Sequence, residues 1–215
     1  MTNFFDLLLQ DTITMMAIID PLGVSAIMLS LLSENTTKHE ISKIAFKSTL
    51  TIVIAFFVVL LSGNFLLNLF GIEIDSLKVM GGIVLLLMAI KMVNGTNESK
   101  NQTKEERAEV REHEDFAIIP LAIPITFGPG IFATILILRN QSENFISLVA
   151  FVMAFLLVAL SVYLAFKNSI YIKKYLGVIG SKIISRLMGL IVGAIAVQFI
   201  VSGLSVLIQE YGYMR

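Results

Sequence analysis

Two short segments of this sequence place proline and glycine inside otherwise apolar runs, where they would interrupt a helix. The first is Asp20-Pro21-Leu22-Gly23, and the second is Gly128-Pro129-Gly130. Proline in a helix interior removes a backbone hydrogen bond and introduces a steric clash, so such a break in a membrane span is costly. It is tolerated where the loosened backbone is buried in protein or lines a polar cavity. Paired interrupted spans in two halves of a chain indicate a transporter substrate site.

Each break is predicted to start a half-helix whose unpaired N–H groups point toward the middle of the membrane. Asp20 is a preferred N-cap residue, and proline, as Pro21 or Pro129, suits the first helical position. Gly128 and Gly130 permit unusual backbone conformations and let a ligand approach closely. A helix N-terminus carries about half a positive charge. Two such ends that converge from opposite directions would bind a small carboxylate without a buried Arg or Lys.

Asp20 is the acidic residue that the sequence places deep in a span, at a cost of at least ~2.5–3.5 kcal/mol. It could couple transport to Na⁺ or H⁺ or contact a substrate ammonium. Alternatively, it could be an N-cap for the N–H groups of Leu22 and Gly23, and both roles can hold together. An Asp20 that caps its own half-helix would weaken that end for anions. The substrate carboxylate would then lie at residues 128–130 and the ammonium toward Asp20.

Other polar residues of the spans could line the same cavity. They are Thr14, Ser25, Thr126, Thr134, Gln198 and Ser202. Hydroxyl groups in membrane helices often bond to the preceding turn, which is a structural role. A buried amide needs partners, so Gln198 is a stronger candidate. The predicted substrate-binding residues are Asp20, Pro21, Leu22, Gly23, Ser25, Thr126, Gly128, Pro129, Gly130 and Gln198.

The composition is that of an all-α membrane protein. Apolar residues make up 56% of the 215 residues and charged residues 15%, and the mean hydropathy is +0.86. A soluble domain carries about 25% charged residues. The net charge of zero gives no basic field that would attract nucleic acid. The predicted partners are the lipid bilayer, a small-molecule solute and a second copy in a homo-oligomer. No cofactor is predicted, and the absence of cysteine excludes disulfides and thiolate metal sites.

The apolar residues fall into stretches of about 20 residues, the length that crosses a bilayer. Six spans are predicted, at 6–33, 41–62, 72–93, 116–138, 145–166 and 182–208. The chain then divides into a first three-span unit (1–95), a hydrophilic linker (96–115) and a second three-span unit (116–215). Thr103-Lys104-Glu105-Glu106 in the linker resembles a capping box. A short interfacial helix is predicted at 167–181.

The basic residues predict the orientation. The linkers after spans 1, 3 and 5 contain thirteen of the sixteen Lys and Arg residues, and the other side keeps Lys78, Arg139 and Arg215. The positive-inside rule places the thirteen in the cytoplasm. Both termini are therefore predicted outside, in a multi-pass protein with no cleaved signal peptide.

An offset of 108 residues relates the two halves. It superposes Pro21 on Pro129, and it aligns 77–95 with 185–203, where six of 19 positions are identical. A common offset for spans 1 and 4 and for spans 3 and 6 predicts two three-span repeats. Because three is odd, the second repeat enters the membrane inverted.

The two motifs resemble those of a known family. Asp20-Pro21-Leu22-Gly23, together with the run Ile119-Pro120-Leu121-Ala122-Ile123-Pro124-Ile125-Thr126-Phe127-Gly128-Pro129-Gly130, is similar to the MarC family of six-span bacterial and archaeal membrane proteins. That family includes SnatA-type small neutral amino-acid transporters and is grouped loosely with LysE-type exporters. The family motif usually continues Asp-Pro-x-Gly-Asn-x-Pro, whereas Val24 and Ala26 stand here at the Asn and second Pro positions.

The resemblance implies a plasma-membrane (prokaryotic inner-membrane) protein that transports small neutral amino acids. The leading hypothesis is a secondary transporter or exporter of such zwitterions, coupled to Na⁺ or H⁺, and not an enzyme. A non-transporting scaffold or regulator is one alternative. A membrane enzyme is another, although both histidines, His39 and His113, lie in predicted linkers.

Overall fold

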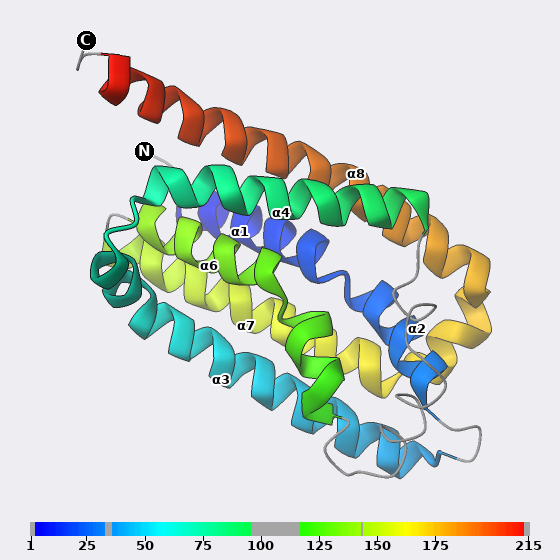
Figure 1. Cartoon of the computed structure of the whole chain (residues 1–215). Coiled ribbons are helices and arrows are strands. Elements are labelled where there is room, and N and C mark those ends of the chain that lie inside the picture. The colour runs from blue at the N-terminus through cyan, green and yellow to red at the C-terminus, as the bar shows by residue number, and fades with distance from the viewer. Residues whose placement is uncertain (1–2, 33–35, 96–116, 143, 213–215) are drawn as a thin grey trace.

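The computed structural model describes residues 3–32, 36–95, 117–142 and 144–212, and the regular elements in these ranges are all helices. They are α1 (Phe4–Ile19), α2 (Pro21–Leu31), α3 (Lys38–Phe70), α4 (Ile74–Asn94), the π-helix η3 (Ile118–Thr126), α6 (Pro129–Gln141), α7 (Phe145–Lys167) and α8 (Ser169–Gly212). Figure 1 shows one elongated bundle in which α4 runs alongside α8.

Five of the described segments are long and apolar enough to cross a membrane. They are Phe4–Leu31, Lys38–Phe70, Ile74–Asn94, Phe145–Lys167 and Ile179–Glu210. The region predicted as the fourth span is instead divided between η3, with 9 residues, and α6, with 13 residues. An all-α membrane protein is therefore confirmed, with five candidate spans among the described residues, and the six-span arrangement stays a prediction.

Two helices extend beyond their predicted bounds. The second span was predicted to end near residue 62, yet α3 continues to Phe70. Gly63 is buried within this helix and leaves room for the Leu136 side chain of α6. The helix ends where Gly71 takes a left-handed conformation with φ 63°, which suits glycine. α8 begins at Ser169 and kinks at Gly177, so the predicted interfacial helix is its first part. The predicted linker 96–115 and its capping box lie outside the described residues.

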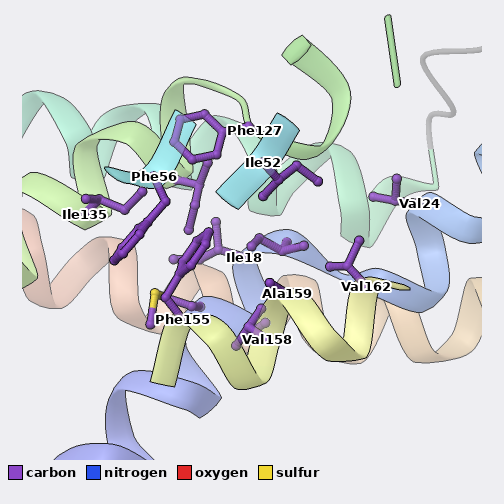
Figure 2. Close-up of a cluster of buried hydrophobic side chains, with 14 of the residues drawn as sticks. Ile18, Val24, Ile52, Phe56, Phe127, Ile135, Phe155, Val158, Ala159 and Val162 are labelled. Carbon is purple, nitrogen blue, oxygen red and sulfur yellow. The ribbon is translucent and has the colours of Figure 1, made fainter. Parts of the chain in front are cut away.

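Stacked phenylalanines join α3 to α7 in the core. The rings of Phe56 and Phe155 are 3.8 Å apart between centroids and nearly parallel, with an interplanar angle of 8°. Both side chains are fully buried, as is Phe151 beside them. Figure 2 shows this cluster extending to Ile18 of α1 and Ile135 of α6. The core thus packs against α1 and α6, the helices that adjoin the two breaks.

Small residues set the spacing between α4 and α8. An added Cβ at Gly82 would lie 2.7 Å from the Ala196 carbonyl oxygen, and one at Gly189 would lie 2.8 Å from Cβ of Met92. These glycines therefore permit close helix packing. The contacts pair early residues of α4 with late residues of α8, so the two helices are antiparallel.

Candidate functional site

The first break separates α1 from α2 at Asp20. This residue has φ 45° and ψ 67°, a left-handed conformation that is uncommon outside glycine, and it is followed by Pro21 at the first position of α2. Its Oδ1 accepts a hydrogen bond from the Gly23 N–H at 3.1 Å, as an N-cap does. Only 7% of Asp20 is exposed. The predicted helix restart at Pro21 is confirmed.

A serine from α8 supplies a second contact to Asp20. The Ser185 hydroxyl donates to Oδ2 at 2.5 Å. Gly23 leaves the space for this contact, because an added methyl group there would collide with both side chains. The two carboxylate oxygens therefore have different partners, one on its own helix and one on α8.

The second break lies between η3 and α6. Ile119 and Ile123 have extended backbones within η3, with φ −122° and −130°. Each precedes a proline, which disfavours the helical region for the residue before it. Gly128 is also extended, and Pro129 is the first residue of α6, so the predicted restart is confirmed here too.

The two helix starts differ in charge. Asp20 caps α2, whereas no side chain caps the start of α6 at Gly128. The Asp20 carboxylate offsets the positive end of the α2 dipole. The positive end of the α6 dipole has no side-chain cap. An anion is therefore better accommodated at α6 and a cation at Asp20.

Both breaks open into one cavity of about 640 Å³, the central cavity. Its lining includes Asp20 and Gly23 from the first break and Thr126, Gly128 and Gly130 from the second. α4 and α8 complete the wall. Both breaks, at residues 18–23 and 126–130, thus contribute residues to the wall of the same cavity.

One end of the central cavity is basic and polar. Lys91 of α4 and Lys173 and Lys182 of α8 line it. Ser169 also lines the wall there; it is fully buried, and its hydroxyl has no hydrogen-bond partner among the described residues. By the Lys and Arg distribution, this end corresponds to the predicted cytoplasmic side.

Comparison with known proteins identifies the family. The sequence matches the model of the family described as "MarC family integral membrane protein" over residues 5–208. This chain belongs to the MarC family.

Curated MarC-like relatives cover nearly the whole chain. A UPF0056 membrane protein of Aquifex aeolicus is 34% identical over 98% of both chains. The UPF0056 membrane protein YhcE of Escherichia coli is 30% identical over 89% of both. A similar protein of Methanocaldococcus jannaschii is 32% identical over 87% of this chain and 91% of its own. No solved structure matches this MarC protein.

Seven of the ten predicted binding residues of this MarC protein line the central cavity. They are Asp20, Gly23, Ser25, Thr126, Gly128, Pro129 and Gly130. Pro21 and Leu22 belong to the first break but do not line the central cavity. Gln198 lines a separate cavity. The hydroxyls of Ser25 and Thr126 donate to the carbonyls of Leu22 and Leu121, both at 2.8 Å. These two residues shape the wall while bonding to their own helices, and their part in substrate binding stays a prediction.

Sequence reasoning on this MarC protein missed the contribution of α8. Ser185 binds Asp20, and Ser169 and Lys182 line the central cavity, although they are far from both motifs in sequence. From the sequence, Lys91 and Lys182 indicated only the orientation in the membrane. The one available signal was that Ser185 begins the repeated stretch 185–203, which says nothing of what it contacts.

Proposed function

We propose that this MarC protein is a secondary transporter or exporter of small neutral amino acids or similar zwitterions, bound in the central cavity. The observation that carries the proposal is the convergence of two helix starts on one hollow. Its volume lies within the range of about 300–1,000 Å³ typical of small-molecule sites. The membrane context comes from the family and the apolar helices.

The charges around the central cavity suit a zwitterion. The uncapped N-terminus of α6 would bind the carboxylate, and the Asp20 carboxylate would bind the ammonium or a coupling Na⁺ or H⁺. The Ser169 hydroxyl, buried and without a partner among the described residues, is a further donor for the solute. The substrate-binding roles of Asp20, Gly128, Pro129 and Gly130 follow from this arrangement.

We further propose the six-span architecture with two inverted three-span repeats. Residues 118–141 would be about 36 Å long at 1.5 Å per residue, enough to cross a bilayer despite the break. Pro21 and Pro129, related by the offset of 108, both stand at the first helical position. The antiparallel packing of α4 against α8, which are equivalent helices of the two repeats, also supports inversion. The chain would reside in the plasma membrane with both termini outside.

The test is uptake by proteoliposomes. Purified protein is reconstituted, a Na⁺ or H⁺ gradient is imposed, and accumulation of labelled glycine and alanine is measured. The expected result is uptake above that of empty liposomes, dependent on the gradient and reduced in Asp20→Asn. Uptake equal to that of empty liposomes over a broad panel of small solutes would overturn the proposal in favour of a scaffold or regulator. Release of a chemically altered solute would indicate an enzyme.

A further inference from the structure

A second, smaller cavity lies at the opposite end of the bundle from the lysines. Its volume is about 150 Å³. It is formed by the first halves of α1 and α7, the end of α6 and the second half of α8. Its polar lining includes Gln10, Asp11, Thr14, Gln198 and Ser202. Polar groups within spans face the protein interior or a water-filled space and often mark a solute path.

The offset of 108 residues relates this second cavity to the central cavity. Three residues that line the basic end of the central cavity fall on three that line the second cavity. The pairs are Ser30 with Leu138, Leu87 with Ile195, and Lys91 with Phe199. Residues beside the breaks instead map within the central cavity, since Ile18 falls on Thr126 and Asp20 on Gly128. In an inverted repeat, a shared central site maps onto itself and each mouth maps onto the other.

Buried, mostly apolar residues separate the two cavities. On α1, Thr14 lines the second cavity and Ile18 lines the central cavity. Four residues of helix span about 6 Å. Met15 of α1, Ile135 of α6 and Val192 of α8 lie between the positions of their own helices that line the two cavities, and all three are fully buried. Figure 2 shows Ile18 and Ile135 within the buried cluster.

We propose that the second cavity is the opposite half of the solute pathway, separated from the central cavity in this structure and joined to it when the central cavity closes toward the lysines. The inference rests on the proposed function and adds a second solute-accessible site, with a carboxylate at Asp11 and an amide at Gln198 for a small zwitterion. The structure is the conformation in which the wide cavity faces the basic end. A solute bound between the breaks leaves or arrives through the second cavity after Met15, Ile18, Ile135 and Val192 separate.

The absence of native cysteine allows a direct test. Gln198→Cys places a thiol in the second cavity, and Val197→Cys is its matched control. Val197 neighbours it on α8 and is exposed like Gln198, but it does not line the cavity. Each variant is reconstituted, and vesicles in which the side opposite the lysines faces the medium are treated with a membrane-impermeant thiol reagent. Uptake of labelled glycine and alanine is measured before and after.

The expected result is that Gln198→Cys reacts from this side and that modification lowers uptake at least tenfold. Val197→Cys should keep its uptake after the same treatment. A Gln198 thiol that does not react from this side, reacts only from the lysine side, or reacts without loss of uptake would overturn the inference. Uptake by vesicles that have not been treated with the reagent separates the two proposals. If these vesicles take up the solute but modification of the Gln198 thiol does not lower uptake, the second half-pathway alone is refuted. If they take up no solute, both the transport proposal and this inference are refuted.

Discussion

At the residue scale, the decisive group is Asp20, because one side chain performs two tasks. Its Oδ1 caps α2 through Gly23, and its Oδ2 accepts from Ser185 at the wall of the central cavity. The two interpretations that the sequence left open are therefore compatible, since the cap uses only one of the oxygens. The cap is confirmed by the structure, and the coupling or ammonium-binding role stays a prediction.

The two tasks of Asp20 can be separated by substitution. Asparagine is as good an N-cap as aspartate but carries no charge. We expect Asp20→Asn to fold with near-normal thermal stability and to lose at least tenfold in glycine or alanine uptake. Asp20→Ala should additionally lose about 0.5–2 kcal/mol of stability with the cap. Normal uptake by Asp20→Asn at every pH would remove Asp20 from coupling and from ammonium binding.

Ser185 is expected to position the Asp20 carboxylate. A hydrogen bond to a charged group contributes about 1.5–3 kcal/mol, so Ser185→Ala should raise the KM for uptake about tenfold with little change in the maximal rate. Ser205→Ala is the matched control on α8, because that exposed hydroxyl donates to the Ser202 carbonyl of its own helix. Equal kinetics for the two variants would contradict the positioning role.

At the scale of elements, the broken helices follow from local chemistry, and their packing does not. Proline and its preceding residue determine where η3 is irregular and where α2 and α6 begin, so the sequence predicted both restarts. The sequence placed the end of the second span near residue 62, whereas α3 continues to Phe70. In the bundle, Leu136 of α6 fills the space beside Gly63, a contact between helices that the local sequence does not show.

The α4–α8 interface gives a prediction at this scale. An added Cβ at Gly82 would lie 2.6 Å from Cγ1 of Ile200 and 2.7 Å from the Ala196 carbonyl oxygen, whereas one at Gly193 would lie 3.5 Å from Cβ of Ala89. Gly82→Ala should therefore destabilise the folded protein by about 1–3 kcal/mol. Gly193→Ala, an ordinary van der Waals contact, should be close to neutral. Thermal unfolding in detergent compares them, and equal melting temperatures would argue against close packing here.

At the scale of the whole molecule, both ends of the described chain lie at the same end of the bundle (Figure 1). The two cavities lie toward opposite ends, and the lysine-lined one is much the larger. The distribution of Lys and Arg assigns the lysine-lined end to the cytoplasm.

This orientation can be measured with two single cysteines. Glu73→Cys lies between α3 and α4, and Asn168→Cys lies between α7 and α8; both positions are exposed. In right-side-out vesicles an impermeant thiol reagent should label Glu73→Cys and spare Asn168→Cys, and inside-out vesicles should give the reverse. The opposite pattern would place the termini in the cytoplasm and invert the assignment of the two cavities.

The sequence by itself determined the features that arise within a few residues or from composition. These are the apolar helices, the restarts at Pro21 and Pro129, and the family motifs, because proline geometry, capping and hydropathy act locally. Only the tertiary structure decided that Ser185 binds Asp20 and that Gln198 lies in a different cavity from the breaks. Both depend on how α8 crosses the other helices. That crossing is set by side-chain packing between residues more than 100 positions apart, which no local pattern encodes.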